Sequence, residues 1–124
     1  MKKKILIIED DLTFQNLVEL GLEKEGFEVL KAQNGEEGLE VALRERPDLI
    51  LLDIIMPVMD GMTMLAKLRE NPWGRSAKVI LLSNMSDTGK VKKEHEDYGA
   101  YAYITKANVN MNDLLKMILV ATKK

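Results

Sequence analysis

Short apolar runs alternate with longer amphipathic stretches along the chain. The runs are rich in β-branched residues, and three of them are nearly continuous rather than alternating. Continuous apolar runs of this length are typical of strands covered on both faces, as in a parallel sheet. We therefore predict strands at Ile5–Ile8, Phe27–Leu30, Leu49–Leu52, Val79–Leu82 and Tyr101–Ile104.

The stretches between these runs repeat apolar residues at intervals of three and four, which predicts helices with one buried face. The clearest stripes are Phe14, Val18 and Leu22 in the first stretch and Leu114, Leu115, Ile118 and Leu119 in the last. Capping, loop or terminating residues mark the helix boundaries: Gly26, Asn34, Pro47, Asp60, Asp87 and either Asn110 or Asn112. The strand–helix order repeats throughout, which predicts a doubly wound α/β sandwich around a parallel sheet.

Composition adds several exclusions to this picture. The 124 residues suit one domain, and the net charge of −2 gives no basic excess for nucleic-acid binding. The absence of cysteine excludes thiol and cysteine-zinc chemistry, and a lone histidine, His95, excludes sites with two imidazoles. The apolar run after the lysine-rich start is too short for a signal peptide, and no run is long enough to span a membrane. We expect a soluble cytoplasmic protein.

Acidic residues follow the first and third predicted strands. Glu9, Asp10 and Asp11 come directly after the first strand, and Asp53 comes after the third. Ligand chemistry in an open parallel sheet collects at the carboxyl ends of the strands, so these carboxylates converge if the two strands are neighbours. Like charges at close range repel, and Mg²⁺ is one cation that carboxylate oxygens hold. We interpret Asp11 as a loop acid or helix cap rather than a ligand.

Two further polar residues belong to the same edge of the sheet. Ser83 ends the fourth predicted strand, and Lys106 follows the fifth. Each alone could be a solvated loop residue, but their coincidence with the acids argues for a site. No glycine-rich phosphate loop follows the first strand. A carboxylate nucleophile beside a metal, with a lysine to neutralise phosphoryl charge, fits phosphoryl transfer onto an aspartate.

Four segments carry this chemistry in order along the chain: Ile5–Asp11, Asp53–Gly61, Leu82–Ser83 and Tyr103–Lys106. Together they resemble the receiver domain of bacterial two-component response regulators, in particular single-domain chemotaxis regulators. The stretch from Asp53 to Gly61 is the most specific, and the resemblance covers essentially the whole chain. It implies a flavodoxin-like (βα)5 fold with strand order 2-1-3-4-5, and one receiver domain over residues 1–124 with no output domain.

The resemblance also implies roles for the acids. Asp53 matches the phosphoacceptor, which receives a phosphoryl group from a phosphohistidine of a sensor histidine kinase or a phosphotransfer protein. Asp10 and Asp53 match direct ligands of Mg²⁺, and Glu9 matches a residue that acts through water. The backbone carbonyl of Ile55 matches the third protein ligand.

The other matching residues imply a switch. Lys106 matches the lysine that pairs with the phosphoryl oxygens, Ser83 the switch hydroxyl and Tyr103 the switch aromatic. In the family the last two move inward together on phosphorylation and change the surface formed by the fourth helix, fifth strand and fifth helix. The implied protein catalyses its own phosphotransfer and slow dephosphorylation without being a conventional turnover enzyme. It binds an unknown output protein, neither nucleic acid nor membrane, and is a monomer or a weak phosphorylation-dependent dimer.

The sequence departs from the family pattern at three positions near this edge. Ala107 follows Lys106 where the family usually has a cis proline, and cis bonds to other residues are costly, so we predict a trans Lys106–Ala107 bond. Asn84 stands where many members have a small residue. Ile55 lacks the polar side chain that some fast-hydrolysing members use near the attacking water. We therefore predict a fairly long-lived phosphoaspartate.

Two other functions stay open from the sequence. Ala107 and Asn84 would suit a phosphorylation-independent scaffold with a degenerate site, although the acids and the lysine are all present. A metal-dependent phosphatase with an aspartyl nucleophile is the other alternative. Such enzymes usually place two aspartates two residues apart after the first strand, and the position of Asp53 does not fit that layout.

Overall fold

The computed structural model describes residues 2–83 and 98–123 of the chain. Its strands are β1 (Lys4–Ile8), β2 (Glu28–Ala32), β3 (Leu49–Asp53), β4 (Val79–Ser83) and β5 (Ala102–Thr105). Its helices are α1 (Leu12–Lys24), α2 (Gly35–Glu45), α3 (Gly61–Glu70), the short 3-10 helix η1 (Lys106–Asn108) and α5 (Met111–Thr122). The fourth predicted helix lies outside the described residues, and so do Asp87 and His95. Asn84 lies outside them as well.

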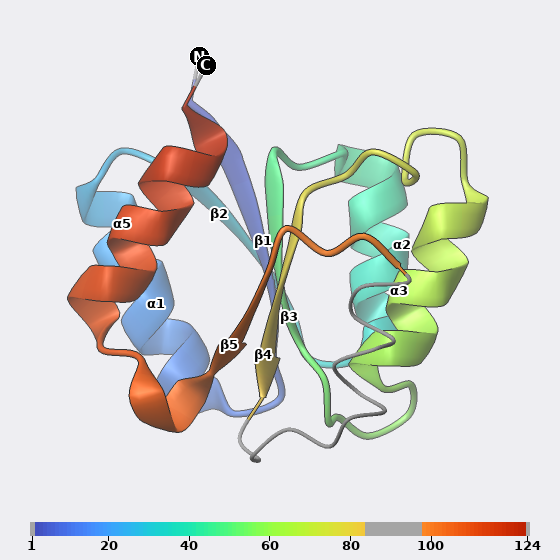
Figure 1. Ribbon diagram of the computed structural model, residues 1–124, viewed down its shortest axis with the longest axis horizontal. Helices are drawn as coiled ribbons and strands as arrows, with labels where there is room; N and C mark the ends of the chain where they lie inside the picture. Colours follow the sequence, from blue (N-terminus) through green and yellow to red (C-terminus); the bar gives the residue numbers. More distant parts are fainter. Residues whose placement is uncertain (1, 84–97, 124) are drawn as a thin grey trace.

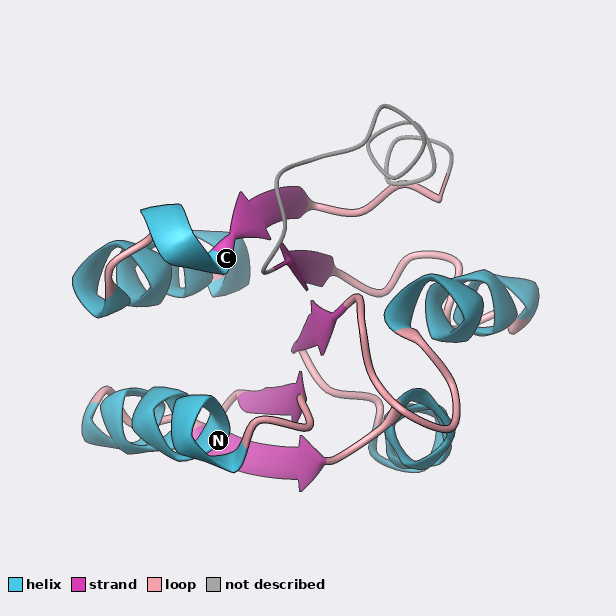
Figure 2. Ribbon diagram, turned by 90° about the horizontal axis from the view of Figure 1, so that it is seen from below, coloured by secondary structure: helices cyan, strands magenta, loops and turns pink. Residues whose placement is uncertain are grey.

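The strands form one parallel sheet in the order β2-β1-β3-β4-β5, as predicted. Figure 1 shows α1 and α5 on one side of this sheet and α2 and α3 on the other. Figure 2 shows the same three layers from below. The doubly wound sandwich is therefore confirmed for the described part of the chain. Among the same residues, no helix is long and apolar enough to cross a membrane.

The core explains why the central strands are continuously apolar. Successive side chains of a strand point to opposite faces of the sheet, so both faces must be covered. In β1, Ile5 and Ile7 belong to the cluster with α1 and α5, whereas Leu6 and Ile8 belong to the cluster with α2 and α3. All four side chains are fully buried. The pattern of the sequence is thus the pattern of a strand between two helical layers.

The helices begin at side chains that accept hydrogen bonds from their first turns. Asn34 accepts from the backbone N–H of Glu37, and Asn110 accepts from that of Asp113, which confirms both predicted caps. Asp60 caps α3 in the same way. Asp11 caps α1 through the N–H of Phe14, in agreement with its interpretation as a cap. These caps fix the starts of α1, α2, α3 and α5.

Val58 adopts a backbone conformation that β-branched residues rarely take. Its φ is 68° and its side chain is 77% exposed, so little packing compensates for the strain. We expect Val58→Asn to raise the free energy of unfolding by about 1 kcal/mol, because asparagine tolerates this region better. Urea unfolding measures the change. Val120→Asn, at an exposed position in α5, is the control and should not stabilise the protein.

Candidate functional site

Three carboxylates converge at the carboxyl ends of β1 and β3, which are neighbours in the sheet. One oxygen from each of Glu9, Asp10 and Asp53 lies within 4.8 Å of the others. Glu9 and Asp53 are buried, whereas Asp10 is exposed. The structure thus brings together the acids that the sequence singled out as candidate ligands, with one side of the group open to solvent.

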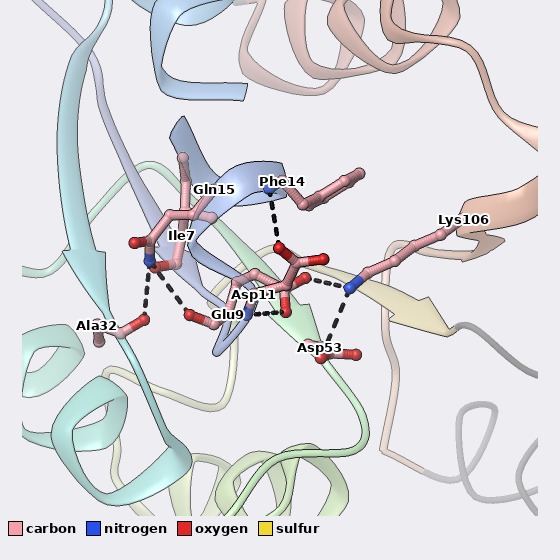
Figure 3. A network of polar contacts seen from close by, with 8 residues as sticks. All are labelled: Ile7, Glu9, Asp11, Phe14, Gln15, Ala32, Asp53 and Lys106. Atoms are coloured by element: carbon pink, nitrogen blue, oxygen red, sulfur yellow. Dashed lines mark hydrogen bonds and ion pairs between the residues drawn. The ribbon is translucent and has the colours of Figure 1, made fainter. Parts of the chain in front are cut away.

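Lys106 supplies the positive charge beside these acids (Figure 3). Its ammonium forms an ion pair with Glu9 Oε1 and lies 3.6 Å from Asp53 Oδ2. The lysine side chain is only 8% exposed. Lys106 comes directly after β5, at the first residue of η1. All peptide bonds among the described residues are trans, so the prediction for Lys106–Ala107 is confirmed.

The crowding of carboxylates changes the ionisation of Asp53. Burial, followed by the hydrogen bond and the charge of Glu9, raises the pKa of Asp53 to about 7, although the charge of Lys106 acts in the opposite direction. One ammonium therefore leaves the negative charge of three carboxylates incompletely balanced. A divalent cation with oxygen ligands fits this donor set, because Mg²⁺ binds carboxylates, carbonyls and water.

The turn after β1 is held by a buried amide that the sequence analysis did not identify. Gln15 is 2% exposed, and its Nε2 donates to the backbone carbonyls of Ile7, Glu9 and Ala32. The carboxylate of Glu9 also accepts a hydrogen bond from the N–H of Asp11. These bonds fix the ends of β1 and β2 and thereby the position of the Glu9 side chain.

The remaining predicted site residues lie near this edge. Ser83 is buried at the end of β4, one residue beyond Leu82, which pairs in register with Asp53. Tyr103 is half-buried in β5 and packs against the core cluster beneath α2 and α3. The side chain of Ile55 is 61% exposed in the loop after β3. The structure therefore places Ser83 beside the acids, and Tyr103 further back along β5.

Comparison with known proteins agrees with this geometry. The chain is 36% identical to the alkaline phosphatase synthesis transcriptional regulatory protein PhoP of Bacillus subtilis, over 106 residues. The match covers 86% of this chain and 43% of PhoP. The response regulator PleD of Caulobacter vibrioides is also 36% identical over 106 residues, which make up 23% of its length. The chain thus spans less than half the length of these relatives.

Solved receiver domains have the same fold. A CheY-like receiver domain protein of Methanospirillum hungatei superposes with a TM-score of 0.90 at 33% identity, covering 98% of this chain and 94% of that one. The receiver domain of sensor histidine kinase PA1611 of Pseudomonas aeruginosa, solved with magnesium in its active site cleft, gives 0.86 at 25% identity and 98% coverage of both chains. Residues 5–119 match the family model of the response regulator receiver domain. The chain therefore belongs to the response regulator receiver domain family.

Proposed function

We propose that this chain is a phosphorylation-dependent signalling receiver whose phosphoacceptor is Asp53. A carboxylate oxygen of Asp53 forms a bond to phosphorus while the P–N bond of a phosphohistidine breaks, and the electron pair of that bond returns to the imidazole. The donor is a sensor histidine kinase or a phosphotransfer protein. The observation that carries the proposal is the convergence of Glu9, Asp10 and Asp53 with Lys106 at one edge of the sheet.

Glu9, Asp10, Asp53 and the backbone carbonyl of Ile55 are the residues that would hold Mg²⁺. When bound, the ion supplies positive charge that offsets the repulsion among the carboxylates and the charge on the phosphoryl oxygens. The raised pKa of Asp53 supports this assignment, because its cause is burial beside another acid. Lys106 pairs with a phosphoryl oxygen, and its low exposure strengthens that attraction.

The proposed response to phosphorylation begins at Ser83 and Tyr103. A phosphoryl group adds negative charge and strong acceptor oxygens, and the Ser83 hydroxyl donates to one of them. Movement of Ser83 leaves space for Tyr103, and the surface of β5 and α5 then changes for an output protein. The burial of Ser83 at the end of β4 supports this role. We propose a cytoplasmic protein, monomeric or weakly dimeric after phosphorylation, that binds neither nucleic acid nor membrane directly.

Intact-mass spectrometry after incubation with acetyl phosphate tests the phosphoacceptor. We expect the wild-type chain to gain one phosphoryl group in the presence of Mg²⁺ and none in EDTA. Asp53→Asn should gain none, whereas Asp113→Asn, which changes an exposed acid in α5, should behave as the wild type. A folded wild-type protein that gains no phosphoryl group would contradict the proposal and support a phosphorylation-independent scaffold.

The phosphoaspartate is expected to be long-lived because Ile55 offers no polar side chain to the attacking water. Ile55→Asn should shorten its lifetime about fivefold, the effect of one additional hydrogen bond in the transition state. Loss of the phosphoryl mass with time measures the rate. Val58→Asn introduces the same amide into the same exposed loop and should leave the lifetime unchanged. An unchanged lifetime in Ile55→Asn would argue against a water-orienting role for this position.

A further inference from the structure

An aromatic ring lies beside the ammonium of Lys106. The centroid of the Phe14 ring is 4.7 Å from Lys106 Nζ, and Figure 3 shows the two side chains at the same site. Phe14 belongs to the first turn of α1 and is half-buried. Phe14 packs against the core cluster that contains Val18 and Leu22, and its ring also contacts Lys106 at the functional edge.

We propose that Phe14 is a positioning residue that holds the Lys106 ammonium beside Asp53 for phosphoryl transfer, an inference that rests on the proposed function. A cation within about 6 Å of a ring centroid is attracted by the electron density of the ring face, and more strongly when it is shielded from water. The Lys106 side chain is 8% exposed, so the shielding is present. The ammonium thus contacts the carboxylates of Glu9 and Asp53 and the ring of Phe14.

The contacts of the Lys106 ammonium with the carboxylates and its contact with the Phe14 ring respond differently to the reaction. Glu9 and Asp53 are also the candidate ligands of the metal ion, and Asp53 changes its charge when it is phosphorylated. The Phe14 ring has no ionisable group and takes no part in bond formation, so its attraction for the ammonium persists. A contact that persists keeps the lysine oriented toward the incoming phosphoryl oxygens, which is how positioning lowers a barrier.

The backbone fixes the ring in relation to the acids. The N–H of Phe14 donates to the cap Asp11, and the N–H of Asp11 donates to the carboxylate of Glu9. The side-chain amide of the next residue, Gln15, donates a hydrogen bond to the carbonyl of Glu9. The turn that presents Glu9 to the site therefore also presents the ring to Lys106.

Replacement of the ring tests its effect on the reaction. We expect Phe14→Leu to slow Mg²⁺-dependent phosphorylation by acetyl phosphate about tenfold, and Phe14→Tyr to stay within about twofold of the wild type, because tyrosine keeps the ring. Phenylalanines with one, two and three ring fluorines at position 14 should slow the reaction progressively, since fluorine withdraws electron density while hardly changing shape. A residue that only packs would be insensitive to this series.

The second phenylalanine of the chain provides a matched control. Phe27 lies in the core cluster on the same face of the sheet and is 8% exposed. The same fluorinated residues at position 27 should leave the rate of phosphorylation unchanged. Equal rates across the series at position 14, or an equal decline at position 27, would overturn the proposal.

Nuclear magnetic resonance tests the contact without any phosphorylation. The ring current of Phe14 should shift the ε-methylene protons of Lys106 upfield in the wild type, and Phe14→Leu should return them to the usual position of lysine. Lys106 ε-methylene resonances at the same position in the wild type and in Phe14→Leu would overturn the proposal. A wild-type chain that takes up no phosphoryl group would instead refute the proposed function and the positioning role with it, while this shift would still report whether the ring contacts the ammonium.

Discussion

Asp53→Asn is expected to raise the free energy of unfolding of the protein in EDTA by roughly 2–4 kcal/mol at pH 8. At this pH the carboxylate of Asp53 is ionised although its side chain is 4% exposed and lies beside Glu9. The amide has nearly the same shape and no charge, so it removes the burial penalty and the repulsion. It also removes the attraction of Lys106, which is the smaller effect on the ionisation of Asp53.

The size of this gain depends on pH in a direction set by the pKa of Asp53. The carboxyl titrates near 3.8 when unperturbed, and the fold raises its pKa to about 7. Between these values the folded protein holds a proton that the unfolded chain has released, so the stability of the wild type falls as the pH rises. The advantage of Asp53→Asn should therefore be small near pH 4, grow up to pH 7 and then level off.

Urea unfolding in EDTA at several pH values measures this gain, with Asp113→Asn as the control for loss of an exposed acid. Added Mg²⁺ should stabilise the wild type and leave Asp53→Asn nearly unaffected, because a ligand stabilises only the folded state that binds it. A variant less stable than the wild type at pH 8, or a gain independent of pH, would contradict the expectation. Either result would mean that the buried carboxylate of Asp53 does not lower the stability of the folded protein for the sake of its function.

Much of the fold could be predicted because the central strands are buried on both faces. The boundaries of the edge strand β2 could be predicted less well. We predicted Phe27–Leu30, whereas β2 is Glu28–Ala32. The N–H of Phe27 bonds to the carbonyl of Leu22 at the end of α1, so this apolar residue does not join the ladder of β2. Lys31 pairs with Ile7 in that ladder although its side chain is polar and exposed.

The grouping of Glu9, Asp10, Asp53 and Lys106 could be predicted because parallel strands end at the same edge of the sheet. The burial of Gln15 could not be predicted. The apolar spacing along α1 fits a buried face that includes Phe14 equally well as a buried face that includes Gln15. The buried residues of α1 are in fact Gln15, Val18 and Leu22. Gln15 is a polar residue at helical spacing with Val18 and Leu22, and this is the signal that could have identified the buried amide.

Arg69 shows a second kind of contact that sequence patterns do not reveal. Its guanidinium donates to the backbone carbonyls of Gly74, Ala77, Tyr98 and Gly99. These bonds join the end of α3 to the segment before β4, where Gly74 and Ala77 lie, and to the segment before β5, where Tyr98 and Gly99 lie. Every residue has a carbonyl, so no residue type marks such a partner. Burial lowers the pKa of Arg69 from its ordinary value, in agreement with a cation held mainly by backbone oxygens.

Gly61→Ala is expected to lower the free energy of unfolding by about 2–3 kcal/mol, as overpacking of a tight contact does. A Cβ on Gly61 would overlap the carbonyl oxygen of Asp53 and lie 2.9 Å from the Cα of Ile54. Both neighbours are backbone, so they cannot rotate away as a side chain would. The N–H of Gly61 also donates to the carbonyl of Ile54 at 2.8 Å, which holds the start of α3 against the end of β3.

Gly21→Ala separates this contact from the general effect of replacing a glycine. Its Cβ would lie 3.0 Å from the end of the flexible Leu115 side chain, and alanine favours the helix, so we expect a change within about 1 kcal/mol. Urea unfolding of both variants measures the difference. Because relief of the overlap at Gly61 must displace the backbone of Asp53, Gly61→Ala should also weaken the stabilisation of the protein by Mg²⁺, and Gly21→Ala should not. Equal losses in the two variants would show that the close approach of α3 to β3 does not set the geometry of the acidic site.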